Sequence, residues 1–245
     1  MLRQIFFAII ALGLTATVQA VNVFLLGDTE AETQVKQALE DAGHTVTFGG
    51  LYNDWDGITP DIQGFDVTVL LNGEGYGYFL QPVADTAIDQ FVSNGGGLIM
   101  TEWTAYDVYY DYKSATIANL MPVATPDADY NYGFTWRVID KSHPLANGMS
   151  ASWIDAAGSS YVNPKAGTCV VIEGIFEGRV GNPLLSYSGI NGGTVIYINH
   201  DMTYTTDTMS ANALQIMVNS VEFAALPFPP GVICENIFSS GFENR

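Results

Sequence analysis

Most of the side chains that could take part in chemistry stand at, or just after, the ends of apolar runs. They are Asp28, Glu74, Tyr76, Glu102, Trp103, His200 and Asp201. Glu102 and His200 suit general base and general acid catalysis, provided that burial moves the pKa of Glu102 toward neutral. The aromatic rings suit sugar binding, because rings stack on sugar faces and carboxylates accept hydrogen bonds from hydroxyls. These residue types therefore allow either catalysis or ligand binding.

Alternating strands and helices would position these residues. The apolar run 21–26 is typical of a strand buried on both faces, and a helix that stops at Gly43 follows it. The pattern repeats with a strand at 66–71, a helix beginning at Pro82 and a strand at 98–101. Because the carboxyl ends of parallel strands meet at one edge of a sheet, we expect an α/β fold whose candidate residues converge there.

The second half of the chain is rich in short β runs. They cover residues 134–139, 168–175, 183–188 and 194–199, and a helix is expected over about 208–225. Asn191-Gly192, within the segment 190–194, indicates a tight hairpin turn. We interpret residues 21–226 as one domain and residues 227–245 as a C-terminal tail.

The first twenty residues have the pattern of a secretory signal peptide. Arg3 gives a positive start, residues 5–14 are apolar apart from Gly13, and residues 18–20 resemble a cleavage site. The apolar run is too short to span a bilayer. We expect cleavage after Ala20 and a secreted or periplasmic protein with no membrane segment after cleavage.

The cysteine count leaves two alternatives open. The sequence contains only Cys169 and Cys234, one in a β run and one in the tail. Export permits disulfides, so a bridge could tie the tail to the domain. Two unpaired thiols are the other alternative, because a sequence does not show which residues are close in space.

The composition narrows the class of ligand. Eight Lys and Arg against 26 Asp and Glu give a net charge of −18, and loss of Arg3 with the signal peptide would make the balance 7 against 26, or −19. Nucleic acids and anionic lipids are bound by clustered basic side chains, which this chain lacks. We therefore expect neither as a partner, and expect a neutral or cationic small molecule or a glycan instead.

Three segments have the order and spacing of a known superfamily. They are residues 91–103 (FVSNGGGLIMTEW), 143–149 (HPLANGM) and 193–200 (GTVIYINH). Together they resemble the class I glutamine amidotransferase-like superfamily, especially its ThuA-like branch and the trimerisation domain of some β-galactosidases. The resemblance spans residues 21–226. It implies a flavodoxin-like three-layer sandwich with a mostly parallel central sheet, a β-rich C-terminal half and a site at the carboxyl ends of the strands.

The chain departs from this superfamily at the catalytic position. Active amidotransferases of this fold carry a Cys on the turn after the fourth strand, and a late His followed two residues later by Glu. Here Glu102 stands at the Cys position, His200 at the His position and Met202 where the Glu would be. A carboxylate does not replace the thiolate that this reaction needs. We predict that the chain has no glutamine amidotransferase activity.

Two functional hypotheses remain. In the first, which we prefer, the domain binds a ligand or assembles into a homo-oligomer. Tyr106, Tyr109, Tyr110 and Tyr112 would add to the binding surface, although they could equally pack a helix against the sheet. In the second, the domain is a hydrolase, carbohydrate-active or otherwise, that uses Glu102 and His200.

A cation site is a weaker alternative. Asp54, Asp56 and Asp61 resemble part of a calcium loop, but the full pattern of alternating ligands is missing, so a polar turn is the favoured interpretation. We expect no bound metal and no cofactor.

Overall fold

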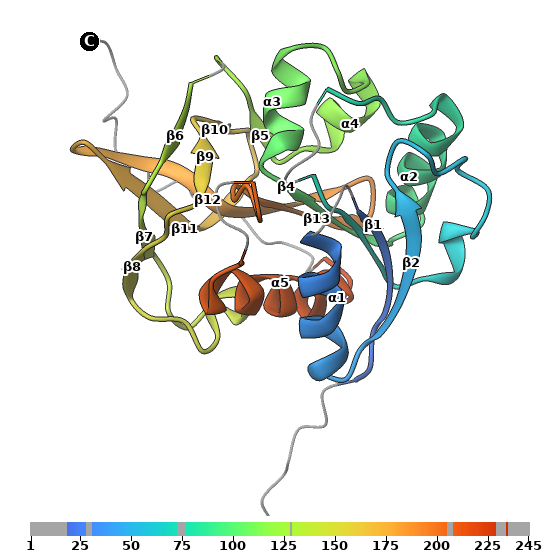
Figure 1. The fold of residues 1–245 in the computed structure, drawn as a ribbon, viewed down its shortest axis with the longest axis horizontal. Coiled ribbons are helices and arrows are strands. Elements are labelled where there is room, and N and C mark those ends of the chain that lie inside the picture. The colour runs from blue at the N-terminus through green and yellow to red at the C-terminus, as the bar shows by residue number, and fades with distance from the viewer. Residues whose placement is uncertain are drawn as a thin grey trace, which may run out of the picture.

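Nine strands of the described part of the chain form a single sheet (Figure 1). The computed structural model describes residues 19–27, 31–72, 77–127, 129–204, 208–228 and 234. Five strands run parallel, in the order β2 (Thr45–Leu51), β1 (Asn22–Gly27), β3 (Val67–Leu70), β4 (Gly97–Thr101) and β13 (Gly193–Ile198). Antiparallel strands extend the sheet, in the order β12 (Arg179–Ile190), β11 (Cys169–Phe176), β7 (Thr135–Val138) and β8 (Ser152–Ile154). The β-rich second half therefore continues the parallel sheet rather than forming a layer of its own.

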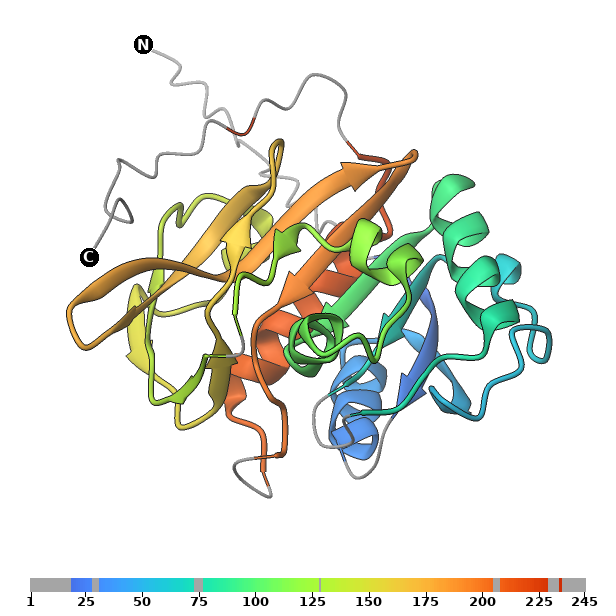
Figure 2. The ribbon, with the colours of Figure 1, turned by 90° about the horizontal axis from the view of Figure 1, so that it is seen from above.

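Helices cover both faces of this sheet (Figure 1). One face carries α1 (Ala31–Asp41) and α5 (Ala211–Ala224). The other carries α2 (Pro82–Ser93), α3 (Trp103–Tyr109) and α4 (Ala115–Leu120). In Figure 2 the β11–β12 ribbon and α2 lie at opposite ends of the molecule. The expected flavodoxin-like three-layer α/β fold is confirmed.

Short elements complete the described chain. Two small antiparallel pairs lie outside the main sheet: β5 (Val123–Ala124) with β10 (Asn163–Pro164), and β6 (Tyr130–Tyr132) with β9 (Gly158–Ser160). Single 3₁₀ turns are η1 (Ile62–Gly64) and η2 (Pro144–Ala146). Among the described residues, no helix has the length and apolar character needed to cross a membrane.

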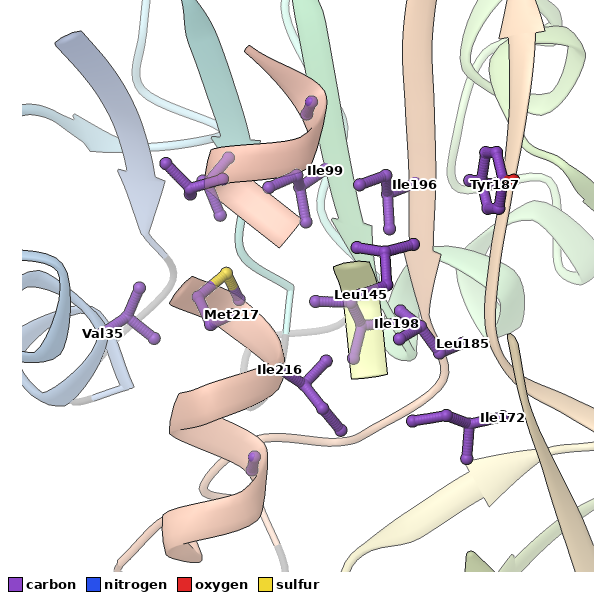
Figure 3. Packing of buried hydrophobic residues seen from close by; sticks show 14 of the residues in the cluster. Val35, Ile99, Leu145, Ile172, Leu185, Tyr187, Ile196, Ile198, Ile216 and Met217 are labelled. Atoms are coloured by element: carbon purple, nitrogen blue, oxygen red, sulfur yellow. The ribbon is translucent and has the colours of Figure 1, made fainter. Parts of the chain in front are cut away.

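Both faces of the central strands are buried, because helices cover each face of the sheet. Side chains alternate along a strand, so successive residues enter opposite layers. Ile196 and Ile198 of β13 pack in one layer with Met217 of α5 (Figure 3). Val195 and Tyr197 of the same strand belong to the layer beneath α2, α3 and α4. A strand between two apolar layers appears in sequence as an unbroken apolar run, which explains why such runs located the central strands.

A two-residue hairpin joins β12 to β13. Ile190 pairs with Gly193, and the loop residues Asn191 and Gly192 have φ angles of 52° and 105°. Positive φ at both loop positions matches the turn type that Asn-Gly favours. The predicted turn thereby pairs β13 with β12. On its other side β13 pairs with β4, so it lies at the junction of the antiparallel and parallel halves.

The two cysteines form a disulfide bond. Cys169 at the start of β11 is joined to Cys234, with their Cα atoms 4.9 Å apart. Before this bond the chain leaves α5, and the ring of Phe228 packs against Gly189 and Tyr187 of β12. Of the two alternatives for the cysteines, the structure has the bridge. Residues 1–18, in the predicted signal peptide, and most of the predicted tail lie outside the described residues.

We predict that reducing this disulfide destabilises the domain. The bond joins residues 65 positions apart, so it restricts a large part of the unfolded chain, and its loss should lower the free energy of unfolding by about 2–4 kcal/mol. Urea unfolding with and without dithiothreitol measures this change. The Cys169→Ser/Cys234→Ser variant is the control and should not respond to the reductant. An unchanged midpoint in the reduced wild-type protein would contradict the prediction.

Candidate functional site

The carboxyl ends of β3, β4 and β13 meet at one edge of the sheet, as the sequence predicted. The amide of Glu102 donates to the carbonyl of His200 at 3.3 Å, and the amide of Trp103 donates to the carbonyl of Asn72 at 3.2 Å. The chain turns directly from β4 into α3 at Glu102. Main-chain hydrogen bonds therefore fix the position of the proposed site.

Glu102 is fully buried at this edge, with 0% of its surface exposed. Its Oε1 atom accepts a hydrogen bond from Ser160 Oγ, and the hydroxyl of Tyr197 lies 3.2 Å from its main-chain carbonyl. Its Oε2 atom has no hydrogen-bond partner among the described residues. Burial raises the pKa of Glu102 well above its usual value, and the nearby charges of Asp201 and Asp107 add to this against the Ser160 hydrogen bond. The buried environment therefore favours the protonated form of this carboxyl group.

His200 is also buried, at 2% exposure, but its partners are different. The amide of Met202 donates to His200 Nδ1 at 2.9 Å, which assigns the ring proton of the neutral imidazole to Nε2. That nitrogen lies 3.6 Å from Asp155 Oδ1. The other oxygen of Asp155 accepts a hydrogen bond from Ser210 Oγ at 2.6 Å, at the start of α5. His200 thus links the end of β13 to α5.

Asp155 is held as an anion in this arrangement. Burial by itself raises the pKa of its carboxyl, but the attraction of the nearby His200 ring and the hydrogen bonds from Ser210 and the Ala157 amide outweigh burial. The pKa of Asp155 therefore falls below its usual range. An anionic Asp155 thus faces the Nε2 side of the His200 ring.

Glu102 and His200 do not form the acid–base pair that the sequence suggested. The register of the sheet pairs Thr101 with Ile198, so Glu102 lies beside Asn199, and His200 is one residue further along. A shift of one residue turns a side chain to the opposite face of a sheet. The described link between the two residues is a main-chain hydrogen bond, and the catalytic hypothesis gains no support from this geometry.

Asp201 and Trp103 have structural contacts of their own. Asp201 is fully buried, and its Oδ2 atom accepts hydrogen bonds from the Gly158 amide at 2.8 Å and from the Tyr130 hydroxyl at 2.5 Å. The Tyr130 ring in turn stacks on Trp103, with ring centroids 5.0 Å apart. Asp201 therefore orients an aromatic pair. The remaining candidates, Asp28, Glu74 and Tyr76, lie outside the described residues.

Aromatic side chains form a connected series of ring contacts at this edge, and several of them are exposed. We call it the aromatic track, and it consists of Phe79, Trp103, Tyr106, Tyr109, Tyr110, Tyr112, Tyr130, Tyr132 and Tyr204. Trp103 is its buried centre, in contact with Tyr106, Tyr130 and Tyr204 at centroid distances of 4.7–5.0 Å. The tyrosines after the turn are thus not simply packing residues, since Tyr109 and Tyr110 are exposed.

Four members of the track were not predicted from the sequence. Phe79 precedes α2, Tyr130 and Tyr132 lie in the short strand β6, and Tyr204 follows β13 in the chain. Tyr130 reaches the site because β6 pairs with β9, where Gly158 leaves room for the Tyr130 hydroxyl: a Cβ atom there would lie 1.9 Å from it. The sequence carried no signal for the pairing of β6 with β9. For Tyr204 a signal existed, because this residue follows closely after the candidates His200 and Asp201.

A buried ion pair supports the track from below. Lys113 Nζ lies 2.6 Å from Asp107 Oδ2, and both side chains have no exposed surface. Asp107 also accepts hydrogen bonds from Asn72 and from the Gly77 amide, and Lys113 donates to the carbonyl of Tyr78. This network joins α3 to the end of β3 and to the segment that carries Phe79.

The described residues contain no group of three His, Cys, Asp or Glu side chains placed to hold a metal ion. The aspartates that resembled a calcium loop have main-chain partners instead. Asp56 Oδ1 accepts hydrogen bonds from the amides of Ile58 and Thr59, and Asp61 Oδ1 accepts one from the amide of Gln63. These contacts are those of polar turns.

The parallel strands, the sharp β4–α3 turn and the site at the strand edge define a flavodoxin-like α/β protein. Residues 41–214 match the family model GATase1-like, described as "Putative glutamine amidotransferase", so the chain belongs to this family. Among curated proteins, none gives a significant match. The predicted resemblance to the amidotransferase-like superfamily is confirmed.

Solved structures show the same fold at low sequence identity. A cytoplasmic protein from Salmonella typhimurium is 19% identical with a TM-score of 0.61, and the match covers 83% of this chain and 98% of that one. A ThuA-like protein from Bacteroides uniformis is 16% identical with a TM-score of 0.58, covering 84% and 91%. A β-galactosidase from Bacillus circulans sp. alkalophilus is 11% identical with a TM-score of 0.59, covering 82% of this chain but only 30% of the enzyme.

Glutamine amidotransferase chemistry needs a cysteine thiolate, and neither cysteine of this chain is available to supply one. The sequence holds two cysteines, and these are bonded to each other. The turn after β4, where the resemblance places the nucleophile, carries the buried acid Glu102. Membership of the family therefore gives this chain its fold, and its function has to be argued from its own residues.

We predict that the buried ion pair is essential for stability. Lys113→Met leaves the Asp107 carboxylate buried without its cation, which should cost about 3–5 kcal/mol of unfolding free energy. The matched control is Lys36→Met, which removes an exposed pair with Glu40 and should cost under about 0.5 kcal/mol. Adding Asp107→Asn to Lys113→Met should recover part of the loss. Equal effects of the two lysine substitutions would contradict the prediction.

We predict that the burial of Glu102 makes stability depend on pH. A folded pKa above the unfolded value means that the folded state holds a proton that the unfolded state releases. Stability should therefore fall as pH rises from about 4.5 through the folded pKa. Glu102→Gln should remove this part of the pH dependence and raise the thermal midpoint at neutral pH. Glu40→Gln, on the exposed side of α1, is the control. Parallel pH profiles for Glu102→Gln and wild type would show the prediction to be wrong.

Proposed function

We propose that this chain is an exported, non-catalytic domain that binds a neutral carbohydrate at the aromatic track. The observation that carries the proposal is the cluster of exposed tyrosines around a buried tryptophan at the carboxyl edge of the sheet. Ligands of open α/β sheets bind at this edge. A tyrosine offers an apolar ring face and a hydroxyl, which suit the two kinds of surface on a sugar.

The buried state of the acid supports binding over hydrolysis. A hydrolase of the alternative type would need Glu102 and His200 to reach the same substrate atoms. Glu102 accepts a hydrogen bond from Ser160, whereas His200 Nε2 faces the carboxylate of Asp155. Both side chains are buried and have structural partners, so we favour a protein that holds its ligand without cleaving it.

The net charge supports a neutral ligand. At −18 the chain repels anionic polymers at a distance, whereas a neutral glycan meets no such barrier. Export, as the N-terminal pattern predicts, would bring the domain into contact with extracellular or periplasmic glycans. Two of the structurally similar proteins are named as a β-galactosidase and an exo-β-1,4-mannosidase, which makes carbohydrates the first ligands to test.

The proposal predicts retention on neutral polysaccharides. The purified protein should be slowed in affinity gels that contain at least one neutral glucan, mannan or galactan, and should not be slowed by an anionic polysaccharide. Tyr204→Ala should weaken this binding about tenfold, because it removes an exposed ring that contacts Trp103. Phe48→Ala, an exposed ring on β2, is the matched control and should bind as wild type does.

Two outcomes would overturn the proposal. Free migration through every neutral polysaccharide would remove carbohydrate binding. Release of reducing ends from a retained polysaccharide, abolished by Glu102→Gln, would instead establish the hydrolase alternative.

A further inference from the structure

We propose that the ligand is an elongated, linear chain of neutral sugars that lies along the aromatic track and contacts several rings at once. This inference rests on the proposed function and deepens it, because the same track could in principle hold a single sugar. The distinction depends on how the rings are spaced, which of them are exposed and which charges accompany them.

The rings form a connected row whose two ends lie in different segments of the chain. From Tyr204 the row passes to Trp103, Tyr106 and Tyr110, with successive centroid distances of 4.7, 4.8 and 4.6 Å. It continues through Tyr112 to Phe79 in two further steps of 6.1 and 6.0 Å. The row therefore runs from the segment after β13, along α3, to the segment before α2.

Exposed rings are distributed along the whole row. Tyr204 at one end is 40% exposed, Tyr110 in the middle 44% and Phe79 at the other end 58%. Less exposed members of the row stand between these three rings, which favours a ligand long enough to reach several of them. Each additional stacked ring would add to the affinity.

The framework that carries the row is rigid. Asp201 and Tyr130 hold Trp103 in place, through the Asp201–Tyr130 hydrogen bond and the Tyr130–Trp103 stack. At the other end, the Asp107–Lys113 ion pair ties α3 to the segment before Phe79. A preformed row loses little conformational entropy when it binds an extended ligand.

The charges around the row favour a neutral polysaccharide over other long partners. Lys113, next to Tyr112 in the chain, is buried and paired with Asp107. Asp111, between Tyr110 and Tyr112, is exposed and would repel anionic chains. A second copy of this chain would bring a second net charge of −18 toward the same surface, and this repulsion opposes self-association through the row.

The test is the dependence of affinity on chain length. The probes are linear oligosaccharides of one to six sugars from the polymer retained in the affinity gels, measured by isothermal titration calorimetry with the full purified protein. We expect the hexasaccharide to bind at least about tenfold more tightly than the disaccharide. Phe79→Ala and Tyr110→Ala should each weaken hexasaccharide binding by a larger factor than disaccharide binding. Phe48→Ala should change neither.

The outcomes separate this inference from the proposed function. Equal affinity for the disaccharide and the hexasaccharide would overturn the elongated ligand and leave carbohydrate binding intact. Absence of binding to every oligosaccharide and polymer would overturn both. Concentration-dependent dimers in light scattering, abolished by Phe79→Ala, would assign the row to self-association and also overturn the inference.

Discussion

The position of β13 is the constraint on which the rest of the structure depends. This strand pairs in parallel with β4 and antiparallel with β12, so it joins the two halves of the sheet. Just beyond its end, Asn199 donates to the carbonyls of Ser160 and Pro183 and accepts from the Ser160 amide. Ser160 in turn reaches Glu102. One buried amide side chain thus connects both halves of the sheet to the small β6–β9 pair and to the turn before α3.

This connection explains why the presumed catalytic position has become a structural one. A carboxylate in an enclosed site is costly unless it is paired, and burial accordingly raises the pKa of Glu102, which is hydrogen-bonded to Ser160. One carboxylate oxygen of its neighbour Asp201 accepts hydrogen bonds from the Tyr130 hydroxyl and the Gly158 amide. The polar groups at the strand edge therefore hold aromatic rings in place from below, and the rings themselves form the surface that a ligand would meet.

Much of the fold could be predicted from local sequence patterns. The apolar runs located the central strands because those strands are buried on both faces, and the Asn191-Gly192 pair located the hairpin because few residues accept its backbone angles. The pattern did not show that the antiparallel strands extend the same sheet. That depends on contacts between distant segments, such as β11 with β7.

The candidate site was predicted less completely, for a specific reason. Strand ends were correctly expected to meet, but register decides which side chains share a face, and the pairing of Thr101 with Ile198 sets Glu102 beside Asn199. Tyr130 enters through the pairing of β6 with β9, which has no local signature. Residue types near a strand end thus identified the neighbourhood, whereas the partners within it depend on three-dimensional pairing.

The Cys169–Cys234 bond has a consequence for how the molecule would survive among proteases. It closes a covalent ring that contains β11, β12, β13 and α5. Within this ring the exposed tip of the β11–β12 hairpin, around Glu177 and Gly178, is the kind of segment that proteases cut first. After such a cut the two pieces would remain covalently joined and still paired in the sheet. A nick at the hairpin would therefore leave the aromatic surface attached to its scaffold.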